Sequence, residues 1–494
     1  MLRKIRIALA ALSIIFVTLL FLDFTGSVHA WLGWMAKIQF LPAVLALNVG
    51  VVVALILITL IFGRIYCSVI CPLGIFQDII TWFGGKFKKN RFVYSPALNI
   101  LRYSVLGIFV IALVAGFTSF AALLAPYSAY GRIVSNLFSP LYGWGNNLLA
   151  YFAERADSYA FYSTDVYVRS WITFGVAATT FVVLFILAWH NGRTYCNTIC
   201  PVGSVLGFIA RFSYFKPLIN TSKCVGCKLC TRNCKASCID AENHKIDYSR
   251  CIACMDCLKN CHTDAITYCH PKKKKGEKKI ENKEDETSRR QFITTTAIIA
   301  STAILKAQKK NVDGGLAIIE DKQIPKRTSH IEPSGAISLD HFAQYCTACQ
   351  LCVSVCPNHI LSPSESFDRL MQPEMNYESG ACRPECNNCS SVCPTGAIKP
   401  ITIEEKSSIQ IGHAVWIKKN CVVFSKGDQC GNCARHCPNG AIRMVPVRPD
   451  DPDSARFPMV DIERCIGCGA CEYACPARPF SAIYVEGHQK HRTI

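Results

Sequence analysis

Cysteines are the residues whose number and spacing could do chemistry in this chain. The 494 residues include 30 cysteines, and most of them stand in tight groups at the spacing of metal ligands. A disulfide scaffold explains cysteine richness in short secreted chains, but this chain is long and its groups recur. The pattern therefore indicates metal or cluster binding.

Two consecutive groups follow the bacterial ferredoxin spacing C-x₂-C-x₂-C-x₃-C, in which the fourth cysteine binds the other of two [4Fe–4S] clusters. They supply Cys224, Cys227, Cys230, Cys234, Cys251, Cys254, Cys257 and Cys261. Zinc is disfavoured, because structural zinc sites use paired C-x₂-C knuckles. Neither fourth cysteine precedes a proline, and Cys238 competes with Cys234 as a ligand.

Four further groups lie beyond residue 340. They supply Cys346, Cys349, Cys352, Cys356, Cys382, Cys386, Cys389, Cys393, Cys421, Cys430, Cys433, Cys437, Cys465, Cys468, Cys471 and Cys475. Together the six groups predict six [4Fe–4S] clusters. The spacing leaves open whether groups one and two of these four form a pair, or whether group one pairs with group four around an inner pair. Cys269 is expected to be an ordinary free thiol.

The formal net charge of +18 is misleading by itself. A [4Fe–4S]²⁺ core with four thiolates carries −2, so six of them would bring the charge to about +6. We therefore do not expect nucleic-acid binding. The chain shows no flavin or haem motif.

Four apolar segments reach the ~20 residues that a helix needs to cross a membrane. They are 5–24, 41–63, 103–125 and 170–190. The bias of lysine and arginine places both ends of this four-helix unit on the inner side. The expected fold class is an α-helical membrane domain of four transmembrane helices plus α+β bacterial-ferredoxin-like domains.

Two near copies, "GRIYCSVICPLG" and "GRTYCNTICPVG", close the second and fourth apolar segments. Their shared frame GRxYCxxICPxG contains Cys67, Cys71, Cys196 and Cys200, with Pro72 and Pro201 after the second cysteines. If the membrane helix continues that far, each i,i+4 pair of thiols lies on one face, and the proline favours ending the helix there. The thiols could bind a metal, form redox-active disulfides or pack as apolar groups. The repetition indicates an internal repeat.

A basic linker separates the two ferredoxin-like parts. Within it, "SRRQF" and the apolar run 293–305 are typical of a twin-arginine export signal, which would send residues after about 310 outside. An amphipathic linker helix is the alternative, because the run is short for a span. The expected domains are 1–215 (membrane), 216–270 (two clusters), 271–325 (linker) and 326–494 (four clusters).

These motifs resemble two known families. Residues 1–270 resemble NapH-type membrane ferredoxins, and residues 288–494, with "CRPECNNCSSVCPTGAI" and "IGHAVWIKKNC", resemble NapG-type ferredoxins. The resemblance implies a fusion of the two menaquinol dehydrogenase components of periplasmic nitrate reduction. It implies six [4Fe–4S] clusters, menaquinol as substrate, and the membrane, the quinone pool and a periplasmic reductase or cytochrome as partners. It also implies a cytoplasmic location for 216–270 and a periplasmic one for 326–494.

The membrane half also resembles families of oxidase assembly and nitrous-oxide respiration, so maturation or regulation of a respiratory metalloenzyme is the alternative function. No quinone pocket is recognisable in the sequence. Polar groups near the predicted membrane boundaries are His29, Gln39, Arg64, His190 and Arg193. For the two arginines we expect contacts with lipid headgroups, and for the aromatic segment 126–169 an interfacial belt.

Overall fold

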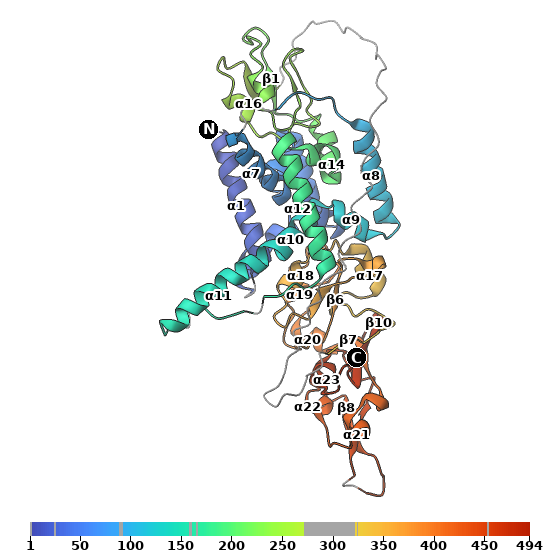
Figure 1. Cartoon of the computed structure of the whole chain (residues 1–494). Coiled ribbons are helices and arrows are strands. Elements are labelled where there is room, and N and C mark those ends of the chain that lie inside the picture. Colours follow the sequence, from blue (N-terminus) through green and yellow to red (C-terminus); the bar gives the residue numbers. More distant parts are fainter. Residues whose placement is uncertain are drawn as a thin grey trace, which may run out of the picture.

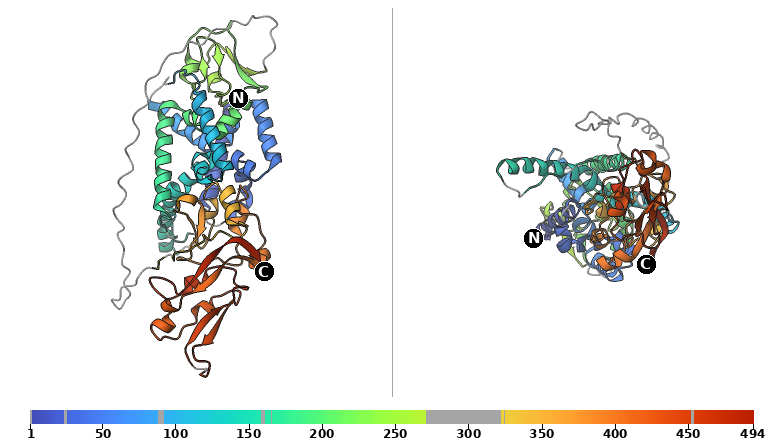
Figure 2. Two further views of the ribbon diagram at one scale, coloured as in Figure 1. Left: turned by 90° about the vertical axis from the view of Figure 1, so that its right-hand side faces the viewer. Right: turned by 90° about the horizontal axis from the view of Figure 1, so that it is seen from below.

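A bundle of helices forms the middle of the molecule, with a cysteine-rich region at each end (Figure 1). The computed structural model describes residues 2–23, 26–87, 92–157, 161–164, 166–270, 322–323, 325–451 and 454–494. The twin-arginine-like segment and most of the predicted linker lie outside the described residues. In both side views, residues 216–270 (the inner region) and residues 325–494 (the outer region) occupy opposite ends of the bundle (Figures 1 and 2).

The bundle is built from helices of very different lengths. They are α1 (Leu2–Leu22), α2 (Ser27–Leu32), α3 (Trp34–Lys37), α4 (Phe40–Leu45), α5 (Val49–Phe62), α6 (Tyr66–Val69), α7 (Pro72–Phe87), α8 (Asn99–Val114), α9 (Thr118–Leu124), α10 (Pro126–Ile133), the π-helical η1 (Val134–Phe138), α11 (Ser139–Arg155), α12 (Trp171–Asn191), α13 (Thr194–Thr198) and α14 (Pro201–Ala210).

Among the described residues, α1 and α12 are long and apolar enough to cross a membrane, judged by length and composition. The other two predicted spans are interrupted. The side chain of Asn48 accepts a hydrogen bond from the Val51 amide and starts a new helix, so segment 41–63 divides into α4 and α5. Gly116, with φ of 82°, separates α8 from α9. Four uninterrupted spans are thus not what the structure contains.

The helices that precede the two frames end before the frame cysteines. Gly63 and Gly192 have φ of 69° and 66°, a conformation that ends a helix at little cost for glycine. The first cysteines lie on the short helices α6 and α13, and the prolines are the first residues of α7 and α14. The condition that each membrane helix continues through its cysteines is therefore not met: the chain turns at the glycine, and the proline starts the next helix instead of ending the preceding one.

Segment 126–169 is largely helical. Tyr127 and Tyr130, on α10, are buried in the bundle core. Tyr142 and Trp144, on α11, are exposed, and α11 projects away from the bundle (Figure 1). Only the part beyond residue 138 therefore has the exposed aromatic character expected of an interfacial belt.

The two cysteine-rich regions consist of short helices and two-stranded antiparallel sheets. The inner region contains β1 (Lys216–Ile219) paired with β4 (Ile266–Cys269), β2 (Ile239–Asp240) paired with β3 (Lys245–Ile246), and helices α15 (Leu229–Arg232) and α16 (Asp256–Lys259). The sheets of the outer region pair β5 (Leu361–Pro363) with β6 (Pro373–Met375), β7 (Ile409–Trp416) with β10 (Ile483–Thr493), and β8 (Ile442–Pro446) with β9 (Arg456–Val460). Its helices are α17 (Leu339–Tyr345), α18 (Leu351–Ser354), η2 (Phe367–Arg369), α19 (Asn388–Val392), α20 (Ile403–Ser408), η3 (Lys418–Asn420), α21 (Val422–Ser425), α22 (Asn432–Arg435) and α23 (Ala470–Ala474).

Polar contacts attach both regions to the bundle. At the inner end, Arg3 on α1 forms an ion pair of 2.6 Å with Asp256. At the outer end, Asn136 donates to Gln350 at 2.8 Å and Ser170 donates to Glu365 at 3.0 Å. Because buried polar groups need partners, these bonds constrain the position of each region on the bundle.

Because the two frames pack closely, one added methyl group at Gly74 is expected to destabilise the fold. A Cβ at Gly74 would lie 2.2 Å from the Cys67 carbonyl oxygen and 2.6 Å from Arg193 Nη1. We expect Gly74→Ala to lower the free energy of unfolding by at least about 1–3 kcal/mol through overpacking. Gly107→Ala on α8 is the control, because no atom lies within 4 Å of its Cβ and alanine favours a helix. Thermal unfolding in detergent measures both; equal midpoints for the two variants would contradict the packing.

Candidate metal centres

Each cysteine group of the inner region shares its cavity with one cysteine of the other group. One cavity is lined by the first three cysteines of group one and by the last cysteine of group two, namely Cys224, Cys227, Cys230 and Cys261. The other is lined by Cys251, Cys254 and Cys257 together with Cys234 and Cys238. This crossing is the arrangement that two [4Fe–4S] clusters require of the ferredoxin spacing.

Cys234 and Cys238 both face the second cavity, with 3.6 Å between their sulfur atoms. Only Cys234 completes the C-x₂-C-x₂-C-x₃-C spacing of its group. Cys234 is therefore the better candidate ligand, and Cys238 is close enough to donate to its sulfur.

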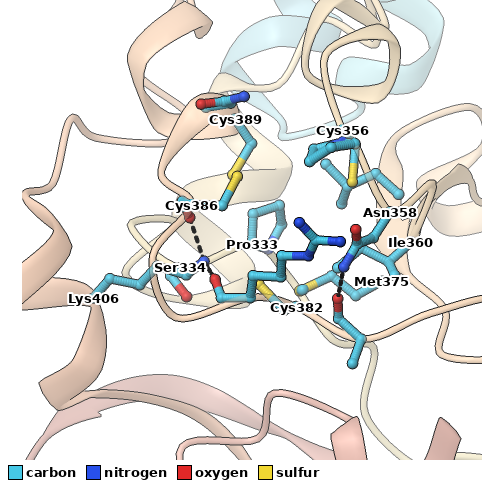
Figure 3. A pocket seen from close by; sticks show the side chains of 15 residues that line it. Pro333, Ser334, Cys356, Asn358, Ile360, Met375, Cys382, Cys386, Cys389 and Lys406 are labelled. Atoms are coloured by element: carbon cyan, nitrogen blue, oxygen red, sulfur yellow. Dashed lines mark hydrogen bonds between the residues drawn. The ribbon is translucent and has the colours of Figure 1, made fainter. Parts of the chain in front are cut away.

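The outer region shows the same crossing. Figure 3 shows Cys382, Cys386 and Cys389 around one space with Cys356, the last cysteine of the preceding group. The buried Lys406 ammonium donates to the Arg383 carbonyl at 2.5 Å and also to the Cys386 carbonyl. A buried positive charge at this wall suits the negative charge of a thiolate-bound cluster.

The other half of the outer region repeats this geometry. Cys465, Cys468 and Cys471 line a cavity with Cys437 of the preceding group. Groups one and two therefore share a site, as do groups three and four, so the alternative pairing of group one with group four is not the one that the structure adopts. The same crossing would divide the remaining cysteines into two sets, and the members of each set lie in the same packed side-chain cluster. One set is Cys346, Cys349, Cys352 and Cys393, and the other is Cys421, Cys430, Cys433 and Cys475.

The backbone of the cysteine loops points amide groups toward the sulfur atoms. The residue after the second cysteine is left-handed in four groups, at Lys228, Met255, Gln350 and Gly469. Amide-to-sulfur hydrogen bonds of 3.2–3.5 Å reach Cys261, Cys346, Cys393, Cys437 and Cys475. Hydrogen bonds to cluster sulfurs are one of the means by which a protein sets a cluster's reduction potential.

A buried arginine lies between the bundle and the outer region. Arg132 is fully buried, and the only hydrogen bond of its guanidinium among the described residues is a long one of 3.5 Å to the carbonyl of Ala348, beside Cys349. Its Nε and Nη2 atoms have no partner there. A buried cation is unfavourable unless it is compensated. A cluster held at Cys349, with its net negative charge, would supply that compensation, so the residues present fit the group.

The two GRxYCxxICP frames pack against each other through exchanged arginines. Arg64 of the first frame donates to the Cys196 carbonyl at 3.1 Å, and Arg193 of the second donates to the Cys67 carbonyl at 3.0 Å. Each guanidinium also lies near the thiol of its own frame, 3.8 Å from Cys67 Sγ and 3.7 Å from Cys196 Sγ. The frames thus form one unit with approximate two-fold symmetry.

All four frame cysteines are buried in one hydrophobic cluster. Gln77 donates to Cys196 Sγ at 3.3 Å, and the Gly203 amide donates to Cys200 Sγ at 3.3 Å. Four buried thiols with nearby N–H donors and two guanidinium groups are suited to holding a metal or cluster as thiolates. Both arginines are fully buried, so the expectation that they contact lipid headgroups is wrong. Each one donates a hydrogen bond to a carbonyl of the opposite frame instead.

The symmetry of the frames fails at one position. Seven residues after the second cysteine stands Asp78 in the first repeat and Gly207 in the second. Asp78 pairs with Arg193 at 2.8 Å, with Lys235 of the inner region at 3.1 Å, and with Arg6. At Gly207 the Arg102 guanidinium fills the space, and an added Cβ would lie 1.9 Å from its Nη2.

Arg64 and Arg102 consequently lie together without a carboxylate partner among the described residues. Both donate to the carbonyl of Ser249, two residues before Cys251, at 3.0 and 3.2 Å. The side of the frames that lacks the aspartate is therefore the side that contacts the loop of an inner cysteine group. A negatively charged cluster at that group would balance these two cations.

Removing the Asp78 charge is expected to destabilise the protein strongly. Burial alone would raise the pKa of Asp78, but the charges of Arg193, Lys235 and Arg6 outweigh it and hold that pKa well below its usual value. Asp78→Asn leaves Arg6 and Arg193 buried without a carboxylate, while Lys235 keeps its ion pair of 3.0 Å with Asp256, and we expect a loss of about 3–5 kcal/mol. Glu242→Gln, which breaks the exposed Lys228–Glu242 pair, should cost less than about 1 kcal/mol.

The pH dependence distinguishes charge from packing. Because the folded pKa of Asp78 lies below the unfolded value of about 3.9, its stabilisation is complete above that value and is lost as the pH falls through the folded pKa. Between pH 5 and pH 2, the free energy of unfolding measured with a chemical denaturant should therefore fall more for the wild type than for Asp78→Asn. Parallel curves for the two proteins would contradict the ion-pair network.

The assignment of Cys234 over Cys238 has its own test. We expect Cys234→Ser to remove one cluster, because serine is a poor ligand at this site, and Cys238→Ser to retain it. Iron and acid-labile sulfide counted on the anaerobically purified proteins measure this. Loss of iron from Cys238→Ser and its retention in Cys234→Ser would reverse the assignment.

Comparison with known families agrees with these groupings. The model of a 4Fe-4S binding domain matches residues 44–90 and 173–219, each of which contains one frame. The model of a 4Fe-4S dicluster domain matches residues 345–397 and 427–478. The first match contains two complete outer cysteine groups, and the second contains the other two groups without Cys421. No solved structure matches the chain significantly.

Several curated proteins are similar to parts of the chain. YccM of Escherichia coli K12, named as an electron transport protein, is 24% identical over 39% of this chain and 47% of its own length. MauM of Methylobacillus flagellatus, named as a methylamine utilization ferredoxin-type protein, is 31% identical over 33% of this chain and 70% of its own length. The ferredoxin-type protein NapG of Escherichia coli K12 is 33% identical over 29% of this chain and 65% of its own length. The chain belongs to the ferredoxin-type iron–sulfur electron-transfer proteins and is similar to the Nap and Mau components of that group.

Proposed function

We propose that this protein is a membrane-bound quinol dehydrogenase component that takes electrons from menaquinol and passes them through [4Fe–4S] clusters to a periplasmic reductase or cytochrome. The observation that carries the proposal is the presence of crossed cysteine sites at both ends of an apolar helix bundle. Several closely spaced clusters suit the conduction of electrons, whereas a simple binding module needs none.

The surface of the bundle supports a membrane location. Large apolar side chains are exposed along α1, α8 and α12, among them Leu9, Ile15, Ile111, Val114 and Ile186. Exposed apolar surface on this scale is typical of contact with lipid. With α1 and α12 as candidate spans, the inner and outer regions would lie on opposite sides of the membrane, with 216–270 cytoplasmic and 326–494 periplasmic.

Six clusters are proposed, two in the inner region and four in the outer region. Their ligands would be the three close cysteines of each group with the last cysteine of its crossing partner. The clusters would supply one-electron transfer, and the protein's part is to hold them, to exclude water and to set their charge environment through Lys406, Arg132 and the amide donors.

The frame cysteines are proposed to bind a metal or to act as a redox relay next to the inner clusters. Arg64 supports this role, because it contacts the first frame, the second frame and Ser249 beside Cys251. We expect the combined change Cys67→Ser with Cys196→Ser to reduce electron flux through the inner region at least tenfold while the iron of the outer region is retained. Unchanged flux would reject a relay and leave packing as the role of these thiols.

Reduction by quinol tests the proposed function. The purified, reconstituted protein is mixed anaerobically with a menaquinol analogue, and cluster reduction is followed by absorbance and electron paramagnetic resonance. Iron and sulfide are counted on the same sample, with about 24 iron atoms expected from six sites. Clusters that dithionite reduces and the quinol does not would favour maturation or regulation of a respiratory metalloenzyme instead.

A further inference from the structure

The largest of the cavities described lies where the bundle meets the outer region. Its volume is about 290 Å³, whereas the cavities between the cysteines measure about 10–30 Å³. Pockets for small molecules and cofactors start near 300 Å³. Apolar and aromatic side chains make up much of its wall, together with the polar side chains of Asn136, Arg169, Gln350 and His359.

The cavity opens where the apolar helices of the bundle begin and end. Phe21 and Leu22 at the end of α1 line it, and Arg169 lies just before the start of α12 at Trp171. Three lining tyrosines, Tyr142, Tyr162 and Tyr167, are 45–59% exposed and form its rim. In the proposed membrane placement the cavity would therefore lie at the ends of the spans α1 and α12, where the lipid meets water.

The inner wall of the cavity is shared with a cysteine site. Cys356 and Pro357 line both this cavity and the cavity formed by Cys382, Cys386 and Cys389 (Figure 3). A ligand in the large cavity would therefore lie next to a ligand residue of a cluster at that site.

Two polar atoms at the cavity are left without a partner. Gln350 is only 2% exposed, and its Oε1 accepts a hydrogen bond from Asn136 at 2.8 Å. Its Nε2 has no partner among the described residues, and neither does Ser135 Oγ, which also belongs to a lining residue. An unpartnered buried donor is costly, and a ligand oxygen would satisfy it.

Arg169 fixes a further polar group at the wall. Its guanidinium donates to the Val353 carbonyl and to His359 Nδ1, the latter at 3.0 Å. Because arginine can only donate, Nδ1 of His359 accepts and the ring proton of the neutral imidazole lies on Nε2. The cavity thus combines an aromatic rim with the N–H donor of Gln350, which suits a carbonyl or hydroxyl oxygen.

We propose that this cavity binds the head group of the quinol and that the Cys356 site receives its electrons. This inference rests on the proposed function. Oxidation breaks the two O–H bonds of the quinol; its two electrons leave one at a time, each reducing an oxidised cluster, and its two protons pass to water at the tyrosine rim. The first electron must move on to a neighbouring cluster before the same site accepts the second.

Two variants test the cavity without touching a cysteine. Gln350→Glu keeps the oxygen that accepts from Asn136 and replaces the unpartnered amino group. Ser139→Trp fills the cavity from a partly exposed position at the start of α11. The matched controls are Gln323→Glu and Ser407→Trp, which change exposed residues, one just before the outer region and one within it. For each protein we would measure cluster reduction by a menaquinol analogue, cluster reduction by dithionite, iron content, and binding of a hydroxyquinoline N-oxide quinol analogue by calorimetry.

The cavity is supported if both test variants bind the analogue at least tenfold more weakly and are reduced by quinol at least tenfold more slowly, while dithionite reduction, iron content and both controls match the wild type. Normal binding and normal quinol reduction in both variants would overturn the cavity and leave the proposed function standing. Failure of the wild type to accept electrons from quinol would overturn the proposed function and this site together. If Ser139→Trp has lost iron, Gln350→Glu alone decides, since it keeps the shape of the side chain.

Discussion

The exchange of Arg64 and Arg193 between the two frames is the interaction on which the rest of the structure depends. Two fully buried guanidinium groups would be unfavourable in an apolar bundle unless every frame supplied acceptors to the other. The carbonyls of Cys67 and Cys196 are those acceptors. Their positions require the glycine turns at Gly63 and Gly192 and a glycine where each arginine crosses. The frames are therefore a joint that holds the two halves of the bundle together and brings four thiols into one cluster.

The departure from symmetry at this joint determines how the inner region attaches. On one side Asp78 gathers Arg6, Arg193 and Lys235 into a compensated network. On the other side Arg64 and Arg102 donate to the loop before Cys251, and neither pairs with a carboxylate in the part of the chain that the structure describes. At the outer end, Arg132 and Lys406 are likewise buried cations that lie beside cysteine sites. These buried cations lack a carboxylate partner among the described residues. Negatively charged clusters at the neighbouring cysteine groups would balance all of them.

The spacing of the cysteines was sufficient to predict iron–sulfur clusters. It was not sufficient to predict where the helices end or which cysteine groups meet. The ferredoxin groups were predictable because C-x₂-C-x₂-C-x₃-C has few other uses, and the crossing of fourth cysteines follows from it. The pairing of the groups in the outer region was not predictable, because it depends on how the fold brings Cys356 to Cys382. Hydropathy could not reveal the helix break at Asn48, since one capping side chain interrupts an otherwise apolar segment. The burial of Arg64 and Arg193 was hidden because their acceptors are backbone carbonyls of the other frame. The lack of an aspartate at Gly207 was visible in the repeat and could have indicated the asymmetry.

The central claim is that the two cysteine-rich regions lie on opposite sides of a membrane, joined by the bundle. Protease accessibility tests it most directly. A specific protease site would be inserted at the exposed turn at Gly427 in the outer region, and another at the exposed turn at Asn243 in the inner region, in separate proteins. The account predicts that protease added to intact spheroplasts cleaves at Gly427 and not at Asn243, and that lysis exposes both. Cleavage of neither site, or of both sites, before lysis would contradict it.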